Sequence, residues 1–309
     1  MTSAVVFAYH DVGVACLSAL LRHGVTVKLV VTHQDNPAEN IWFESVANLA
    51  ITNKLELAKL DDPNSPEFIA QIAALKPDYL FSFYYRLMLK PDLLATATRG
   101  AYNMHGSLLP KYRGRAPINW AVLKGETETG ATLHEMVEKP DAGRIVDQEA
   151  VPILPDDSVL DVFHKISIAA ATTLDRALPR LVDGSAVLRP QNLAAGSYYG
   201  GRKPEDGIIN WHDSAVNVHN LVRAVAPPYP GATTTVKDQA FTITRTALAP
   251  AHLTHGKAGF LNVSSTRCIA LCGDGRMLRV LEGSFDGKIH DEVALCSLLG
   301  VGVYPLGIY

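Results

Sequence analysis

The stretch of sequence that decides the fold is residues 4–32, AVVFAYHDVGVACLSALLRHGVTVKLVVT. Residues 4–9 are apolar and rich in side chains that favour strands, and residues 14–22 repeat apolar side chains at helical spacing before His23-Gly24. Residues 26–32 are a second apolar run rich in valine. A strand, a helix and a strand of these lengths predict one βαβ unit with two parallel strands.

The same alternation continues through the first two-thirds of the chain. Further strands are expected at residues 79–83, 101–105 and 132–137, and further helices at residues 42–54, 67–75 and 157–178, the last one stopped by Pro179. This order predicts an α/β domain with a mostly parallel sheet covered on both faces. Because ligands of such sheets bind beyond the carboxyl ends of the strands, the residues that follow each strand are the candidates for a site.

The character of the sequence changes beyond Pro204. Residues 189–204 contain several helix and strand breakers, which are Gly196, Gly200, Gly201 and Pro204. A predicted helix at 215–225 is then followed by short β-rich runs at 233–236, 241–244, 269–271 and 277–281. We therefore expect a catalytic domain at 1–189, a linker at 190–204 and a small all-β module, a barrel, at 205–309.

Composition excludes several classes of protein. The 309 residues include 28 Lys and Arg against 31 Asp and Glu, a formal charge of −3, so nucleic acid is not expected as a partner. No run approaches the roughly 18 apolar residues of a membrane-spanning helix. Residues 1–11 have no basic segment before the apolar run, so they indicate a first strand and not a signal peptide. The four cysteines are expected as reduced, buried thiols of a cytoplasmic protein: Cys16, Cys268, Cys272 and Cys296.

Two polar side chains share one face at the end of a predicted strand. The two-residue period of a strand at 101–105 puts Asn103 and His105 on one face and Met104 on the other. The Asn103 amide is suited to donate to an oxyanion, and His105 is suited to move a proton near neutral pH. The alternative is a hydrogen-bonded histidine at the rim of the sheet with no part in chemistry.

A carboxylate follows a second predicted strand. Residues 132–137 lead into the turn EKPDAG at 138–143, and Asp141 would emerge at the same end of the sheet as His105 if the two strands run parallel. A carboxylate beside an imidazole favours the protonated ring and fixes its tautomer. The alternative is that Asp141 only stabilises its own turn.

The loop at 107–117, SLLPKYRGRAP, carries three cations before a helix that is expected to begin near Pro117. Cations beside a helix N-terminus suit a phosphate or carboxylate, which makes Ser107 and Arg113 candidate substrate contacts. The first strand is followed by AYHDVG at 8–13, and not by a dinucleotide fingerprint or a P-loop. The eleven histidines show no metal-ligand spacing, so no metal is expected.

These motifs resemble the formyltetrahydrofolate-dependent formyltransferases. The residues that carry the resemblance are NMHGSLLP at 103–110, RGRAPINWA at 113–121, GATLH at 130–134 and DAG at 141–143, with NLVRAV at 220–225 and YPGA at 229–232. The resemblance implies a Rossmann-like formyltransferase domain followed by an OB-like barrel. It also implies that Asn103, His105 and Asp141 form the catalytic trio.

The resemblance further implies a pocket for 10-formyltetrahydrofolate, the formyl donor. The residues that match this pocket are Leu87, Met88, Leu89, Arg115, Val137, Glu138, Lys139, Pro140 and Asp141. Without the resemblance, Leu87–Leu89 could equally be ordinary core after a strand. Arg202 and Lys203 in the linker are candidate contacts for a diphosphate, and a solvated linker is the alternative for these two.

Two features bear on the amine that is formylated. Methionyl-tRNA formyltransferases carry a basic loop after their second strand, whereas residues 32–40, THQDNPAEN, have no Lys or Arg, and residues 205–309 hold 8 Lys and Arg against 9 Asp and Glu. Residues 5–11 (VVFAYHD) and 81–86 (FSFYYR) resemble instead the formyltransferase domains of bifunctional polymyxin-resistance proteins. Those domains act on UDP-4-amino-4-deoxy-L-arabinose in lipid A modification.

The expected function is therefore formyl transfer to the amine of UDP-4-amino-4-deoxy-L-arabinose. The alternatives are formyl transfer to another nucleotide-linked amino sugar, a methionyl-tRNA formyltransferase, and a non-catalytic folate- or nucleotide-binding module. The resemblance stops at Tyr309, before the decarboxylase half of the bifunctional proteins, which implies a free-standing enzyme or part of a longer protein. A homo-oligomer and a separate decarboxylase are the candidate protein partners.

Overall fold

The computed structural model describes residues 2–252 and 257–307 of the chain, which form two compact units. The first unit runs from the start of the described chain to Pro117 and adds Glu128–Val151 and Phe163–Tyr199. The second unit comprises Ile118–Thr127, Pro152–Val162 and the described chain from Gly200 onward. The expected linker at 190–204 thus divides between the units after Tyr199.

The first unit is built on a seven-stranded sheet in the order β3-β2-β1-β4-β5-β7-β8. Its strands are β1 (Ser3–Ala8), β2 (Thr26–Thr32), β3 (Leu57–Lys59), β4 (Tyr79–Phe83), β5 (Gly100–His105), β7 (Glu128–Glu135) and β8 (Ile145–Pro152), and a separate pair is formed by β6 (Arg113–Gly114) and β9 (Tyr198–Tyr199). The helices are α1 (His10–Arg22), α2 (Val46–Thr52), α3 (Pro66–Leu75), α4 (Pro91–Leu94) and α6 (Val159–Asp183), with a 3₁₀ turn η1 (Leu193–Ala195).

The predicted mostly parallel sheet is confirmed. Each of the neighbouring pairs from β3 to β5 is parallel, and β5 pairs with β7 in the antiparallel sense. Ala8 lies opposite Phe83, and Phe83 lies opposite Met104, so the carboxyl ends of β1, β4 and β5 share one edge. The strand order reverses between β1 and β4, which is the place where ligands bind in open α/β sheets.

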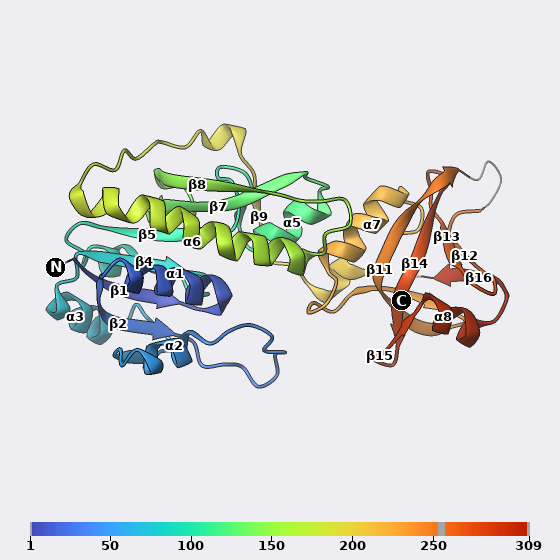
Figure 1. The fold of residues 1–309 in the computed structure, drawn as a ribbon, viewed down its shortest axis with the longest axis horizontal. Coiled ribbons are helices and arrows are strands. Elements are labelled where there is room, and N and C mark those ends of the chain that lie inside the picture. Colours follow the sequence, from blue (N-terminus) through green and yellow to red (C-terminus); the bar gives the residue numbers. More distant parts are fainter. Residues whose placement is uncertain (1, 253–256, 308–309) are drawn as a thin grey trace. The chain divides into compact units, whose positions relative to one another are not determined.

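The central strand β1 is buried on both faces, which explains its nearly continuous apolar sequence. Val5 and Phe7 belong to a cluster with Phe68 and Ile72 of α3 on one face. Helices α1 and α6 lie in front of the sheet in Figure 1, and Arg22 of α1 pairs with an aspartate of α6 at 2.8 Å. Burial on both faces accounts for the strand assignment that the sequence predicts.

The prediction that a helix stops at Pro179 is wrong, because α6 continues to Asp183. The apolar face of the helix extends past the proline, and Leu181 is buried. The hydroxyl of Tyr79 donates to the Leu181 carbonyl at 2.6 Å, and the guanidinium of Arg99 donates to the same carbonyl at 2.9 Å. These tertiary contacts satisfy a carbonyl group of the last turn of α6 that has no partner within the helix.

Two further boundaries differ from the sequence prediction. The helix expected at 42–54 begins only at Val46, because Ser45 caps it by accepting a hydrogen bond from the Asn48 N–H. Phe43 lies outside the helix and stacks on His10, with ring centroids 3.8 Å apart. The strand expected at 132–137 ends at Glu135, so the following residues belong to a loop.

The second unit contains the predicted barrel. Its helices are α5 (Pro117–Leu123), α7 (Ala215–Ala224) and α8 (Glu292–Leu299), with a 3₁₀ turn η2 (Pro204–Gly207), and its strands are β10 (Ala232–Val236), β11 (Gln239–His252), β12 (Phe260–Val263), β13 (Cys268–Leu271), β14 (Arg276–Phe285), β15 (Lys288–Asp291) and β16 (Gly302–Gly307). The sheet order is β11-β10-β16-β12-β13-β14-β15, and β11 also pairs with β14. That extra pairing closes an antiparallel barrel, whose core includes Trp211, Phe241 and Leu278.

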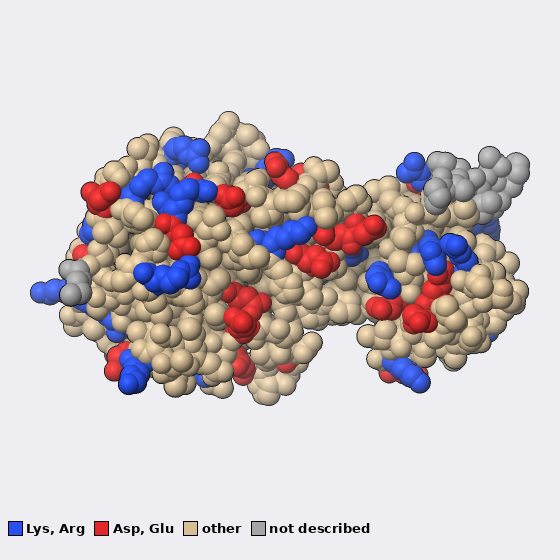
Figure 2. Space-filling model, viewed as in Figure 1, with Lys and Arg blue, Asp and Glu red and all other residues tan. Residues whose placement is uncertain are grey.

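The cysteines, the helix lengths and the surface charges can be compared with the sequence predictions in both units. All four cysteines are buried and free, and the Sγ atoms of Cys268 and Cys296 lie 3.6 Å apart. Within residues 2–252 and 257–307, no helix is long and apolar enough to cross a membrane. Lys and Arg side chains are interspersed with Asp and Glu on the face drawn in Figure 2.

Candidate active site

The candidate site begins at the carboxyl end of β5, where the predicted alternation is observed. Met104 is buried on one face of the strand, and Asn103 and His105 lie on the other. The antiparallel register with β7 places His134 opposite Asn103 and Thr132 opposite His105. Four polar side chains from two strands therefore share one face of the sheet.

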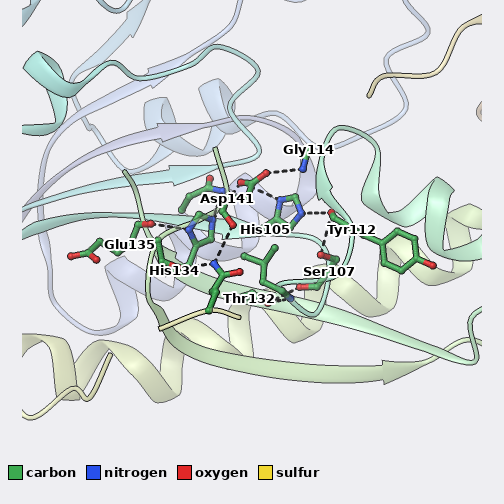
Figure 3. Close-up of polar contacts among 12 residues, drawn as sticks. His105, Ser107, Tyr112, Gly114, Thr132, His134, Glu135 and Asp141 are labelled. Carbon is green, nitrogen blue, oxygen red and sulfur yellow. Dashed lines mark hydrogen bonds and ion pairs between the residues drawn. The ribbon is translucent and has the colours of Figure 1, made fainter. Parts of the chain in front are cut away.

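The ring of His105 is held by the loop that follows β5. It is 6% exposed, and its Nε2 lies 2.8 Å from the Tyr112 carbonyl oxygen. A carbonyl oxygen only accepts hydrogen bonds, so this contact assigns the proton of the neutral ring to Nε2. Figure 3 shows the ring between the Tyr112 carbonyl and the Asp141 carboxylate, with Nδ1 on the side of Asp141.

The Asp141 carboxylate lies among three partners. Its Oδ1 is 3.6 Å from His105 Nδ1 and 3.5 Å from His134 Nε2, and its Oδ2 accepts a hydrogen bond from the Gly114 N–H at 2.9 Å. Burial by itself would raise the pKa of Asp141, but the positive charge that the nearby His105 and His134 rings carry when protonated, together with the Gly114 N–H, outweighs it, so this pKa lies well below its usual value. The carboxylate is therefore ionised at neutral pH.

The route by which Asp141 reaches His105 differs from the one expected. The expectation assumed parallel strands, but β7 runs antiparallel to β5, with Thr132 opposite His105 and Glu135 opposite Tyr102. The carboxyl end of β7 therefore lies at the opposite end of β5 from His105. Residues 136–144 return along the sheet as a loop, and this loop carries Asp141 to the imidazole.

The loop at 136–144 is closed by contacts at its base. The Glu135 N–H donates to the Arg144 carbonyl at 2.9 Å, and the two side chains form a bidentate ion pair. A Cβ at Gly143 would overlap the Glu135 carbonyl oxygen, so only glycine fits there. Gln191 Nε2 donates to the carbonyl oxygens of Asp141 (3.1 Å) and Gly143 (2.6 Å). These bonds fix the part of the loop that carries the carboxylate.

His134 is a member of the site that the sequence analysis did not single out. Its Nδ1 lies 2.9 Å from the Glu135 carbonyl oxygen and its Nε2 lies 3.1 Å from Asn103 Nδ2. Since the carbonyl must accept, Nδ1 carries the proton of the neutral ring and Nε2 accepts from the Asn103 amide. The sequence could have pointed to His134, because it ends the GATLH motif and lies two residues after Thr132, on the same face of the strand.

The predicted substrate contact Ser107 is fully buried. Its hydroxyl donates to the Lys111 carbonyl at 2.7 Å, and its own carbonyl accepts from the Thr132 hydroxyl at 2.6 Å. Thr132 also accepts hydrogen bonds from the Leu109 N–H and from Gln148 Nε2. In this structure Ser107 therefore supports the loop after β5 from inside.

The two arginines of this loop differ in their surroundings. Arg113, in β6, is 8% exposed, its guanidinium lies 5.9 Å from the Tyr198 ring centroid, and its Nε has no hydrogen-bond partner within the described chain. Arg115 is exposed, and its backbone N–H donates to the Tyr199 carbonyl. Arg113 thus combines a buried positive charge with an unused donor.

The residues expected to bind folate form two exposed segments. After β4, Leu87 is 38% and Met88 is 57% exposed, whereas Leu89 packs in the core with Leu93. In the loop before Asp141, Val137 is exposed; Glu138 and Lys139 are exposed too, and Pro140 is half-buried. Leu87, Met88 and Val137 are therefore apolar side chains within reach of solvent.

The two linker residues expected near a diphosphate belong to the second unit. The Arg202 guanidinium lies 5.0 Å from the Trp120 ring centroid and donates to the Asp206 carbonyl at 2.8 Å. The Lys203 N–H donates to the Asp206 carboxylate. Both residues are thus tied to η2. Across the described residues of both units, no group of three His, Cys, Asp or Glu side chains could hold a metal ion.

Comparison with solved structures identifies several chains with this fold. An N-formyltransferase from Helicobacter canadensis, solved with folinic acid and dTDP-3-aminofucose, is 20% identical with a TM-score of 0.73, over 91% of this chain and 99% of that one. WlaRD, a sugar 3N-formyltransferase, is 18% identical with a TM-score of 0.72, over 93% and 99%. HypX from Aquifex aeolicus, with tetrahydrofolic acid, is 19% identical with a TM-score of 0.62, over 96% of this chain and 46% of that one.

Two family models match the sequence directly. The model described as formyl transferase matches residues 5–178, and the model described as the formyl transferase C-terminal domain matches residues 202–293. The first match contains the whole cluster around His105, and the second contains most of the barrel. The chain therefore belongs to the formyl transferase family, and it is an enzyme that transfers formyl groups.

Proposed function

We propose that this enzyme transfers the formyl group of 10-formyltetrahydrofolate to the amine of UDP-4-amino-4-deoxy-L-arabinose. The observation that carries the proposal is the arrangement of His105 between the Tyr112 carbonyl and the ionised Asp141, with the Asn103 amide on the same face of the sheet. This arrangement supplies a proton acceptor and a hydrogen-bond donor side by side. Acyl transfer to an amine needs both of them.

The role proposed for Asn103 is to stabilise negative charge on the formyl oxygen. Attack by the amine nitrogen on the formyl carbon turns the carbonyl oxygen into an oxyanion. The Asn103 amide nitrogen carries two protons, and its contact with His134 Nε2 uses one of them. The second proton is available to the oxyanion. His134 thus positions the amide.

The role proposed for His105 is to carry one proton from the amine to the folate nitrogen. A C–N bond forms to the amine, which loses a proton, and the bond from the formyl carbon to N10 breaks, so that N10 gains a proton. Because Nε2–H donates to Tyr112, Nδ1 is the atom that receives the proton. Asp141 then faces the imidazolium and stabilises its charge.

The folate is proposed to bind against the segment after β4 and the loop before Asp141. Leu87, Met88 and Val137 offer exposed apolar surface for the pterin ring, and Arg115 offers a cation for a carboxylate of the donor. Two similar structures were solved in complex with folinic acid and with tetrahydrofolic acid. They support folate as the donor here.

Arg113 is proposed to bind the diphosphate of the nucleotide sugar. Its guanidinium is buried against Tyr198 and keeps an unpartnered Nε among the described residues, and a phosphate oxygen is the acceptor that arginine binds best. Ser107 stabilises the same loop, because its buried hydroxyl donates to the Lys111 carbonyl. A phosphate contact at Arg202 and Lys203, which belong to the second unit, stays a prediction from the sequence.

The test is an activity screen with 10-formyltetrahydrofolate and a panel of amines. UDP-4-amino-4-deoxy-L-arabinose is expected to give a formamide product with the highest kcat/KM. The panel includes dTDP-linked 3-amino and 4-amino sugars and methionyl-tRNA. Turnover of the arabinose nucleotide below that of another amine would overturn the proposed substrate. Absence of turnover with every nucleotide amino sugar would overturn the proposed class.

A formyltransferase for another nucleotide-linked amino sugar is the second candidate. Two similar structures support it, because one is a complex with dTDP-3-aminofucose and the other is a sugar 3N-formyltransferase. Both candidates use the same three side chains and the same donor. The panel separates them by the base and by the position of the amine.

A further inference from the structure

One stretch of the first unit contacts both loops that lie beside the His105 ring. This stretch is residues 189–199, which follow α6 and which we call the 189–199 segment. At its start, Arg189 exchanges two backbone hydrogen bonds with Ile145, at 2.7 and 2.8 Å, directly after the loop that carries the carboxylate. At its end, β9 pairs with β6, which lies in the loop after β5. The segment is therefore bonded to both sides of the candidate site.

On the carboxylate side, the segment acts through Gln191. Gln191 Nε2 donates to the carbonyl oxygens of Asp141 and Gly143. Asp141 has a φ of 53°, in the left-handed region that is uncommon for residues other than glycine, so these bonds stabilise a backbone conformation that is unfavourable by itself. Asp141 Oδ1 stays 3.6 Å from Nδ1 of His105, which is too long for a hydrogen bond.

On the other side of the ring, the segment contacts Tyr112. The Tyr112 N–H donates to Ser197 Oγ at 2.8 Å, and the Ser197 N–H donates to the Pro110 carbonyl at 3.2 Å. Tyr112 has a positive φ of 57°, and its ring stacks on Tyr199 with centroids 5.4 Å apart. A Cβ at Gly196 would lie 2.2 Å from the Pro110 carbonyl oxygen, so the close approach of the segment to this loop requires glycine.

The two sides of the His105 ring compete for the single proton of its neutral form. Nε2 lies 2.8 Å from the Tyr112 carbonyl oxygen, and this hydrogen bond keeps the proton on Nε2. The Asp141 carboxylate would draw the proton to Nδ1 if it came within hydrogen-bond range. A ring protonated on Nδ1 has no lone pair there to accept a proton, and a histidine base in the wrong tautomer loses up to about 10,000-fold in rate.

We propose that the 189–199 segment sets the tautomer of His105. Ser197 positions the Tyr112 carbonyl as the acceptor of Nε2–H. Gln191 positions the Asp141 carboxylate close enough to stabilise the imidazolium and too far away to take the proton of the neutral ring. Nδ1 therefore keeps its lone pair for the proton of the amine. The inference rests on the proposed function, in which His105 carries that proton.

The experiment first measures the tautomer without turnover. Long-range ¹H–¹⁵N NMR of protein with labelled histidines shows which ring nitrogen carries the proton, and the signal missing from His105→Ala identifies the ring. The neutral ring of the wild type is expected as Nε2–H. In Gly196→Ala the added Cβ moves the segment and the loop apart, and Nδ1–H is expected to become the major form, because the Asp141 carboxylate is the stronger acceptor. Gly200→Ala, whose added Cβ has nothing within 4 Å, is the matched control and is expected to keep Nε2–H.

Steady-state kinetics with the formyl donor and the fastest amine of the panel then give kcat. Gly196→Ala is expected to lower kcat at least about tenfold, since only the minor tautomer accepts the proton. Gln191→Met, which removes both bonds to the turn that carries Asp141, is expected to lower kcat at least about tenfold as well, because a misplacement of about 1 Å can cost 100-fold. Asn192→Ala is its control, because Asn192 is exposed on the same segment.

Each outcome decides the proposal. A folded Gly196→Ala whose neutral ring stays Nε2–H would overturn it whatever its kcat, because the segment would then only support the fold. A wild-type ring in the Nδ1–H form would overturn it too, as would an unchanged kcat in Gln191→Met. If Gly196→Ala does not fold, Ser197→Ala takes its place, and Ser197→Thr, which keeps the hydroxyl, is expected to restore Nε2–H. A chain that formylates no amine would refute the proposed function, and the NMR spectrum would still show where the ring proton lies.

Discussion

The Oδ1 atom of Asp141 lies 3.6 Å from Nδ1 of His105, although the strand before Asp141 runs away from the end of the strand that carries His105. The contact therefore depends on the returning loop and not on two strand ends that meet. The ionised carboxylate also accepts the Gly114 N–H, which ties the loop before Asp141 to the loop after His105.

Asn103→Ala and His105→Ala are expected to fold and to lose activity. Removal of a donor to an oxyanion, the role of Asn103, costs about 100–1000-fold in rate, and removal of the proton carrier His105 costs about 100–10,000-fold. Steady-state kinetics with 10-formyltetrahydrofolate and the amino sugar give kcat, and thermal unfolding gives stability. A variant that keeps its fold and more than about a tenth of the wild-type kcat would contradict the assigned role.

Gly143→Ala is expected to lose activity by moving the loop that carries Asp141. A Cβ at this position overlaps the Glu135 carbonyl oxygen, so the backbone must shift. Gly200→Ala is the matched control, because nothing lies within 4 Å of its added Cβ. We expect at least about a tenfold fall in kcat for Gly143→Ala, since a misplacement of about 1 Å can cost 100-fold. Equal kcat in the two variants would show that the position of the loop that carries Asp141 does not limit the rate of formyl transfer.

Thr132→Val is expected to destabilise the protein by about 1–3 kcal/mol. The substitution removes a hydroxyl that donates to the Ser107 carbonyl and accepts from the Leu109 N–H, and it leaves both groups buried without that partner. Thr129→Val on the same strand is the matched control, because the buried Thr129 hydroxyl has no hydrogen-bond partner among the described residues. Urea unfolding of the two variants measures the difference. If Thr132→Val proved as stable as Thr129→Val, the hydrogen bonds of the Thr132 hydroxyl would not stabilise the protein.

The free energy of unfolding is expected to fall as the pH decreases from about 6.5 toward 4. Burial, with a smaller contribution from Arg86, lowers the pKa of His10 to about 3 and of His33 to about 4, against 6.5 in the unfolded chain. In this window the unfolded state binds protons that the folded state does not, so each ring lowers stability by up to about 1.4 kcal/mol per pH unit. Urea unfolding at several pH values measures the slope.

His33→Gln is expected to make this slope shallower, because glutamine does not titrate. Its side chain can still accept the Arg86 N–H, which His33 Nε2 accepts at 3.0 Å. His164→Gln is the control, since His164 is exposed and its ring stays in water in both states. An unchanged slope in His33→Gln would show that this ring is not the source of the pH dependence.

The parallel part of the sheet could be predicted because its strands are buried on both faces. Runs such as Ala4–Ala8 are continuous and apolar, and the helices between them have clear periodicity. The location of Asn103 and His105 on one face of β5 also followed from the two-residue period of a strand alone. The direction of β7 did not follow, because antiparallel pairing with β5 is set by long-range contacts and leaves no local pattern.

The candidate site was predicted in part for the same reasons. The motif around His105 and the DAG turn marked three polar side chains, but the contact with His134 needed the register of β5 against β7. The length of α6 was misjudged at Pro179, because the bonds from Tyr79 and Arg99 to its last turn come from distant strands and loops.

Closure of the barrel has a consequence for the solubility of the second unit. Since β11 pairs with both β10 and β14, the described part of that sheet ends in β15 alone. An unpaired strand edge invites another chain to add to it and to aggregate. Strand β15 has four residues and begins and ends with Lys288 and Asp291, and short, charged edges resist such addition.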